Sequence, residues 1–229
     1  IRFHTQTGGV TLAAQQPENN IVRVALQGFA AVCGGTQSLH TNGFDEALAL
    51  PTERAARIAL RTQQVIAHES GATDTVDPFA GSYFVENLTD EIEARAQELI
   101  DKVAELGGSV ECIPFIRAEV EESAWSYEQR YKQKQDVVVG VNEFVTDQID
   151  DVEVLRVDPK SEQEQLDRLE AYKADRDHEE LAAKLEELRQ VCRGDANLLH
   201  PIRAALSADA TIGEICGVMR EEFGEYSEA

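Results

Sequence analysis

Two short polar stretches, RFHTQT at residues 2–7 and TQSLHTN at residues 36–42, decide how this chain folds. Each has the length of a β-strand, and each is followed by a helical pattern of apolar residues, over residues 17–34 and 52–71. Strand, helix, strand and helix in this order, with short links, are typical of a parallel α/β sheet or barrel. The sequence therefore predicts an α/β fold for its N-terminal part.

Two parallel strands cannot close a barrel, and an open pair of strands is not stable alone. We therefore expect residues 1–70 to be the end of a larger α/β domain. Residues 71–229 are expected to be mostly helical, with one short strand at 137–144 (VVVGVNEF). Near the C-terminus, Thr211 and Glu214 have the spacing of a capping box, which predicts the start of a helix.

The two predicted strands are polar, whereas parallel strands buried on both faces are normally runs of Val, Ile and Leu. His4 and Gln6 stand two residues apart and so point the same way, as do Ser38 and His40. An unsatisfied buried polar group costs about 1–3 kcal/mol, so either a ligand or a closed side-chain network must satisfy these groups. The strand-end location favours a ligand, because α/β proteins place their sites at the carboxyl ends of strands.

The charge balance excludes several classes of protein. The chain has 43 acidic and 21 basic residues, for a formal net charge of −22, which is unfavourable for binding nucleic acid or an anionic membrane. No run approaches the roughly 20 apolar residues of a membrane helix, and no signal-peptide pattern is present. The acidic excess fits either a protein adapted to concentrated salt or an acidic helical protein of the cytosol.

The cysteines and histidines show no ligand pattern. The four cysteines are far apart, and Cys33, Cys192 and Cys216 stand among apolar residues, so we expect buried free thiols there. The five histidines form no zinc-binding motif. We therefore expect no metal site and a reducing, cytoplasmic location.

Several spaced blocks are very similar to one enzyme family, the adenosylcobalamin-dependent acyl-CoA mutases. These blocks are RFHTQTGG at 2–9, PxNNIVR at 17–23, GGTQSLHTNxFDEA at 34–47, DPxAGSY at 77–83 and VGVN at 139–142. The resemblance implies that the chain holds the last two strand–helix units of a (β/α)8 TIM-type barrel, followed by a helical segment that wraps around it. In this family the barrel axis holds the pantetheine arm of an acyl-CoA, and a separate cobalamin-binding domain caps the barrel.

The resemblance also implies a reaction and its partners. The reaction is a radical 1,2-rearrangement of an acyl-CoA, with (R)-methylmalonyl-CoA and succinyl-CoA as the leading pair and isobutyryl-CoA or 2-hydroxyisobutyryl-CoA as alternatives. The cobalamin-binding D-x-H-x-x-G string is absent, since His178 follows Arg176-Asp177. We therefore expect adenosylcobalamin to be bound mainly by another domain or subunit, and the remainder of the barrel and further copies in an oligomer to be partners. By itself the chain is expected to be inactive. A non-catalytic structural or assembly role is the remaining alternative.

The resemblance assigns roles to six polar side chains: His4, Gln6, Gln37, Ser38, His40 and Glu46. His4 and Gln6 match residues beside the corrin and substrate, and are expected to orient these groups as hydrogen-bond donors. Gln37 and Glu46 match a pair that contacts the adenosyl group, where a carboxylate can grip two ribose hydroxyls. Ser38 and His40 are expected to line the same cavity.

Each of these side chains also has a plainer interpretation that the sequence leaves open. His4 could be a satisfied core histidine. Gln37 could satisfy the backbone of the loop in which it stands. Glu46 could favour the start of the following helix through its negative charge.

Overall fold

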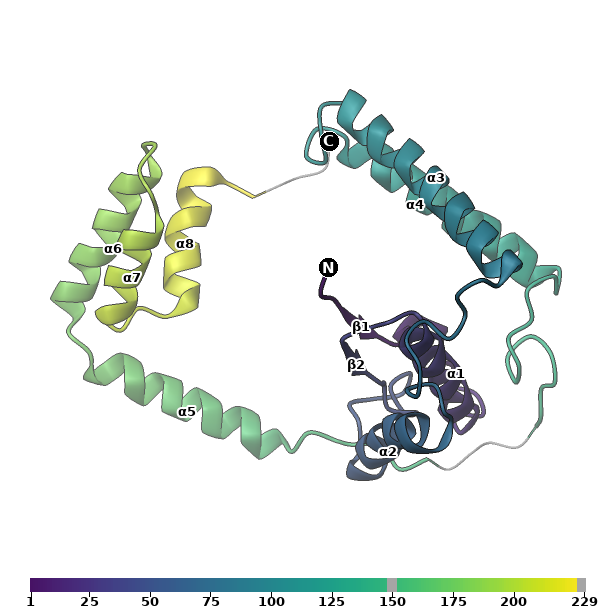
Figure 1. The fold of residues 1–229 in the computed structure, drawn as a ribbon. Coiled ribbons are helices and arrows are strands. Elements are labelled where there is room, and N and C mark those ends of the chain that lie inside the picture. The colour runs from purple at the N-terminus through teal and green to yellow at the C-terminus, as the bar shows by residue number, and fades with distance from the viewer. Residues whose placement is uncertain (148–151, 226–229) are drawn as a thin grey trace. The chain divides into compact units, whose positions relative to one another are not determined.

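The computed structural model describes residues 1–147 and 152–225 (Figure 1). The chain divides into two compact units, Ile1–Arg156 and Val157–Ala229. The boundary expected at residue 70, between the end of a larger α/β domain and a helical segment, stays a prediction, since the two compact units do not test it. No helix of the described residues is long and apolar enough to cross a membrane.

The first unit begins with two strands and two helices in the predicted order. The elements are β1 (His4–Gln6), the 3-10 helix η1 (Gly9–Thr11), α1 (Asn19–Cys33), β2 (Ser38–His40) and α2 (Glu53–Glu69). The strands pair in parallel, with His4 opposite Ser38 and Gln6 opposite His40. The predicted strand–helix–strand–helix order is therefore confirmed as an α/β arrangement within a mostly helical chain.

Helix α1 packs against both β2 and α2. Gly28 makes this close approach possible, because a Cβ there would lie 3.1 Å from Ile66 Cδ1 of α2 and 3.5 Å from Thr41 Cγ2. Thr41 is buried, and its hydroxyl donates to the carbonyl of Ala59 at 2.8 Å. The opposite face of the pair, formed by His4, Gln6, Ser38 and His40, is exposed.

The rest of the first unit holds two long helices, α3 (Tyr83–Glu105) and α4 (Ile113–Lys132), which bury none of their residues. The strand expected at 137–144 is wrong, since this segment has only an isolated bridge between Val139 and Glu143. The backbone turns instead of extending, because Gly140 has a φ of +81° and the side chain of Asn142 accepts a hydrogen bond from the Val138 amide at 2.7 Å.

The second unit is helical and has its own apolar core. Its elements are α5 (Pro159–Asp175), α6 (His178–Cys192), α7 (Leu199–Ser207) and α8 (Ile212–Phe223). Helix α6 packs against both α7 and α8. The buried core residues come from these three helices and the α7–α8 link: Leu181, Leu188, Cys192, Ala205, Ala210, Ile215 and Val218.

The start of α8 is the predicted capping box. The Thr211 hydroxyl accepts from the Glu214 amide at 3.3 Å, and the Glu214 carboxylate accepts from the Thr211 amide at 2.8 Å. The expectation of buried thiols is confirmed for Cys33 and Cys192 but wrong for Cys216, which is exposed. Cys216 directly follows the core residue Ile215, and so points away from the buried stripe of α8.

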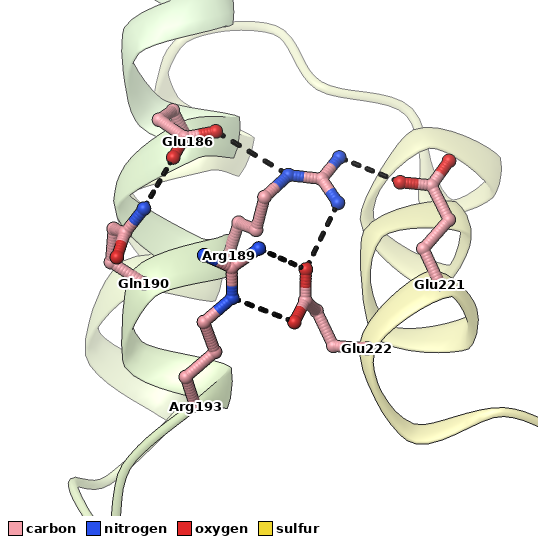
Figure 2. Close-up of polar contacts among 6 residues, drawn as sticks. All are labelled: Glu186, Arg189, Gln190, Arg193, Glu221 and Glu222. Atoms are coloured by element: carbon pink, nitrogen blue, oxygen red, sulfur yellow. Dashed lines mark hydrogen bonds and ion pairs between the residues drawn. The ribbon is translucent and has the colours of Figure 1, made fainter.

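Charged side chains join α6 to α8 beside this core (Figure 2). Arg189 contacts Glu221 at 2.7 Å and Glu222 at 3.2 Å, while Arg193 contacts Glu222 at 2.8 Å. The hydrogen bonds from Arg193 and then Arg189 lower the pKa of Glu222 from 4.5 to about 2. The second unit therefore pairs its own charges across the two helices.

Candidate functional site

The exposed face of the strand pair brings four of the expected residues together. His4 Nδ1 and Ser38 Oγ lie 2.7 Å apart, within hydrogen-bond distance. Gln6 and His40 are the next pair along the two strands. The two-residue period thus places four hydrogen-bonding side chains on one open face, as the sequence predicted.

Beyond the ends of the strands, Asn42 connects Gln6 to Glu46. The Asn42 side-chain oxygen accepts from Gln6 Nε2 at 3.1 Å, and its Nδ2 donates to Glu46 Oε1 at 3.1 Å. The same Nδ2 donates to the Thr7 carbonyl at 3.0 Å, and the Asn42 amide donates to the Thr7 hydroxyl at 3.0 Å. Asn42 is only 2% exposed, so these bonds fix it between the two expected residues.

Sequence reasoning missed Asn42 as a site residue. Asn42-Gly43 is a typical turn dipeptide, which by itself indicates only a break after the second strand. The available signal was its position, because an amide side chain directly after a strand lies at the carboxyl end of the sheet.

Gly9 lets the Glu46 carboxylate lie against the backbone at this edge. A Cβ at residue 9 would lie 2.3 Å from Glu46 Oε1, so any side chain there would displace the carboxylate. The other carboxylate oxygen, Oε2, has no hydrogen-bond partner among the described residues, and Glu46 is exposed. One oxygen of Glu46 is therefore held in place and the other is available.

The structure does not bring Gln37 to Glu46. Gln37 precedes β2, where its Oε1 accepts from the Phe3 amide at 2.8 Å and its Nε2 donates to the Gly35 carbonyl at 2.7 Å. Glu46 lies beyond the other end of the strands, near Gly9. The carboxamide of Gln37 thus satisfies backbone groups, which is the plainer interpretation that the sequence left open.

A hollow of about 720 Å³ opens next to the Gln6–Asn42–Glu46 cluster. Its polar lining includes Gln6, His40 and Glu46, and its apolar wall includes Leu50 and Leu60. This volume and the mixed lining are typical of sites that bind small organic molecules. Among residues 1–147 and 152–225, no group of three His, Cys, Asp or Glu side chains could hold a metal ion.

The sequence profile of the methylmalonyl-CoA mutase family matches residues 1–225 of this chain. The chain belongs to the methylmalonyl-CoA mutase family. This family uses adenosylcobalamin. The polar face, the strand-end cluster and the hollow are therefore features of a chain from a cobalamin-dependent isomerase family.

Individual relatives cover the whole chain. It is 43% identical over 231 residues to the methylmalonyl-CoA mutase of Rhizobium meliloti, covering 99% of this chain and 32% of the relative. It is 43% identical over 234 residues to mitochondrial methylmalonyl-CoA mutase of Homo sapiens, covering 99% of this chain and 31% of the relative. It is 40% identical over 232 residues to the 2-hydroxyisobutanoyl-CoA mutase large subunit of Aquincola tertiaricarbonis, covering 100% of this chain and 41% of the relative.

The chain therefore spans between about a third and two-fifths of the length of these relatives. Two of the three are named for methylmalonyl-CoA and one for 2-hydroxyisobutanoyl-CoA, at nearly equal identity. Identity over this part of the methylmalonyl-CoA mutase family thus does not separate the two named substrates.

Proposed function

We propose that this chain is part of the catalytic subunit of a cobalamin-dependent acyl-CoA mutase that interconverts (R)-methylmalonyl-CoA and succinyl-CoA. The observation that carries the proposal is the Gln6–Asn42–Glu46 cluster, with one free carboxylate oxygen beside a hollow of about 720 Å³. Membership of the family supports the reaction class. The relative named for 2-hydroxyisobutanoyl-CoA supports that acyl-CoA, or isobutyryl-CoA, as the alternative substrate.

Residues 1–70 are the last two strand–helix units of a (β/α)8 barrel in this proposal, and residues 71–229 are its helical wrap. Two features of the strand pair support it. One face lies against α1, where Gly28 approaches Leu39 of β2, as the outer face of a barrel strand lies against its helix, and the opposite face carries His4, Gln6, Ser38 and His40 uncovered. The remainder of the barrel, a cobalamin-binding domain or subunit and further copies of the chain are the proposed partners.

The residues at the strand ends fit the adenosyl group of the cofactor. A carboxylate oxygen that lacks a partner, as Oε2 of Glu46 does, can accept hydrogen bonds from ribose hydroxyls. Asn42, and not Gln37, is the amide side chain beside Glu46, because Asn42 bonds Glu46 directly at 3.1 Å. Adenosylcobalamin, when bound, supplies the radical chemistry of the rearrangement.

The open face of the strands serves the substrate and the cofactor's corrin. His4 engages Ser38 through Nδ1, so its Nε2 is the nitrogen left to hydrogen-bond a bound group. Gln6 is fixed at its Nε2 by Asn42, and its neighbour His40 lines the same hollow. In this proposal these side chains orient the bound groups.

The test is Glu46→Gln in the complete enzyme, assembled with the rest of the barrel and the cobalamin-binding part. Because a carboxylate–hydroxyl hydrogen bond is worth about 1.5–3 kcal/mol, we expect turnover or cofactor affinity to fall by about ten- to a hundredfold. The matched control is Glu53→Gln, since Glu53 is 94% exposed and pairs with Arg57 on the surface of α2.

Three acyl-CoA substrates complete the test. Turnover of methylmalonyl-CoA alone supports the leading substrate, whereas turnover of the isobutyryl or 2-hydroxyisobutyryl thioester supports the alternative. If Glu46→Gln behaves as Glu53→Gln does, the site assignment is wrong. If the assembled enzyme turns over none of the three, the structural or assembly role replaces the proposed one.

A further inference from the structure

A buried asparagine of α1 hydrogen-bonds the backbone of the turn that carries Glu46. Asn20 is 0% exposed, and its Nδ2 donates to the carbonyl of Phe44 at 2.9 Å and to that of Ala13 at 2.8 Å. Its Oδ1 accepts from the Ala13 amide at 3.1 Å. Phe44 is itself buried and lies between Asn42 and Glu46, so the Asn20 side chain fixes the backbone within the strand-end cluster.

Asn20 is in turn held by Arg23, which reaches a distant part of the chain. Arg23 Nη1 donates to Asn20 Oδ1 at 2.7 Å, and Nη2 donates to the carbonyl of Val139 at 2.7 Å. One guanidinium therefore bridges the asparagine beneath the turn and a loop 116 residues later. A planar group with several fixed donors suits such a bridge better than a flexible ammonium.

The loop at 137–144 is shaped to receive this contact. Gln16, just before α1, donates to the Phe144 carbonyl at 3.1 Å. Gly140 leaves room for Gln16, because a Cβ at residue 140 would lie 2.9 Å from Gln16 Cδ. The VGVN block that resembles the family thus has a physical role here, since its glycine admits the glutamine.

The loop is also fixed to the end of α4. Asn142 Nδ2 donates to the carbonyls of Tyr131 at 3.0 Å and Asp136 at 2.8 Å. Lys134 and Glu143 form an ion pair at 2.8 Å, and this contact lowers the pKa of Glu143. Because these contacts hold the loop to the end of α4, its Val139 carbonyl can fix Arg23, which a free loop could not do.

We propose that Arg23 and Asn20 are positioning residues that couple the loop at 137–144 to the turn carrying Asn42 and Glu46. We call this chain of contacts the latch: Val139, Arg23, Asn20 and Phe44. The turn has other supports as well, because Arg54 lies over the Phe44 ring at 5.6 Å. The latch differs from them in joining the turn to the segment after α4. Its effect on the adenosyl group rests on the proposed function, whereas its effect on the turn does not.

The experiment compares Arg23→Gln with Arg57→Gln in the complete protein that contains this chain. Glutamine is too short to reach both Asn20 and Val139, while Arg57 is a surface residue of α2 outside the latch. Hydrogen exchange of the peptides covering 41–50 and 137–144 is the first readout. With Arg23→Gln we expect exchange to rise about three- to tenfold in both peptides, and with Arg57→Gln in neither.

Kinetics of the assembled enzyme are the second readout. Arg23→Gln should raise the KM for adenosylcobalamin about three- to tenfold and leave the KM for the acyl-CoA unchanged, which a general loss of stability would not do. Arg23→Lys, which keeps one donor group, should recover part of the effect. If exchange rises as expected but the enzyme shows no mutase activity, the latch stands and the proposed function fails.

A second variant guards against failure to fold. Gly140→Ala places a methyl group against Gln16 and strains a residue with a φ of +81°, but leaves Arg23 and Asn20 intact. If the latch couples the two segments, this variant should raise hydrogen exchange in peptide 41–50 by disturbing the latch at its Val139 end. If either variant increases exchange at 137–144 while 41–50 stays protected, no coupling exists and the proposal is overturned.

Discussion

Residues 1–70 and residues 157–229 treat their polar groups in opposite ways. The first region carries equal numbers of acidic and basic side chains, and its strands present polar groups on an open face. The second carries twice as many acidic as basic side chains, yet Arg176, Arg189 and Arg193 all have carboxylate partners. The first region bonds several of these groups to one another, as His4 to Ser38, but leaves atoms such as Glu46 Oε2 open to bonding by other atoms. A region that pairs its own charges is complete in itself.

The comparison also locates the net charge. The acidic excess begins after residue 70, so the strand pair and its helices are electrically balanced. A ligand with phosphate groups, such as coenzyme A, would therefore meet little net repulsion from residues 1–70 as a whole. The charge that disfavours nucleic acid for the whole chain does not disfavour a CoA thioester at this site.

The largest expected effect comes from Leu188→Ala in the centre of α6. Leu188 is 0% exposed within the core of the second unit, so its truncation should cost about 2–5 kcal/mol of unfolding free energy. Denaturant unfolding, followed by hydrogen exchange of the α6 and α8 peptides, measures the change. Leu199→Ala is the control, because Leu199 is 70% exposed.

This variant can also break the comparison. If the second unit is complete in itself, exchange in β1 and β2 should be the same in Leu188→Ala as in the parent protein. Loss of protection in both regions together would mean that they unfold as one cooperative unit, and the contrast between them would then be only one of composition.

A smaller effect is expected from acid on the pair of Arg176 and Glu214. The hydrogen bond from Arg176, whose side chain is 7% exposed, lowers the pKa of Glu214 from 4.5 to about 2. Because the folded-state pKa is depressed, the unfolded state binds more protons between these values. The stabilisation is therefore complete above about pH 4.5 and is lost as the pH falls toward 2.

The measurement is the denaturant concentration at which the α8 peptides lose half of their protection from hydrogen exchange. It is repeated between pH 6 and pH 2.5, with exchange rates corrected for pH. In the parent protein this denaturant concentration should decrease as the pH is lowered below 4.5. In Glu214→Gln it should start lower and lose part of this pH dependence, with Glu222 providing the remainder. An unchanged acid slope in the variant would show that Arg176 and Glu214 contribute no stability.

The smallest expected change in stability belongs to Gly9→Ala. Gly9 does not adopt a positive φ, and the nearest atom to a new Cβ is the end of the flexible Glu46 side chain, so we expect a change within about 0.5 kcal/mol. The displaced carboxylate should nevertheless raise the KM for adenosylcobalamin in the assembled enzyme. This result would sharpen the comparison, because a functional change would occur without a stability change. Equal cofactor affinity in both proteins would mean that Glu46 does not need its place against Gly9.

Local patterns predicted the frame of the site. The order of strands and helices, the shared direction of His4 and Gln6 and the capping box at Thr211 all follow from spacings of two to four residues. Such spacings determine which face of an element a side chain occupies. They do not determine which distant groups stand next to it.

The parts that sequence missed depend on long-range contacts. Asn42 joins the cluster only because the register of two strands places it beside Thr7, 35 residues earlier. Gln37 is on the same strand stretch but at the opposite end, and no periodicity distinguishes the two ends. The run VVVGVNEF has strand-forming residues, but the positive φ of Gly140 and the hydrogen bond from the Val138 amide to the Asn142 side chain fold it into a loop.

The latch has a consequence for the order in which the protein is made. Its two ends, Arg23 and Val139, are 116 residues apart, so the loop contact forms only after residues 137–144 have left the ribosome. Until then the turn beside Glu46 lacks that support, although β1, α1 and β2 have all been synthesised. The turn beside Glu46 therefore gains its full set of contacts only once residues 137–144 have been synthesised.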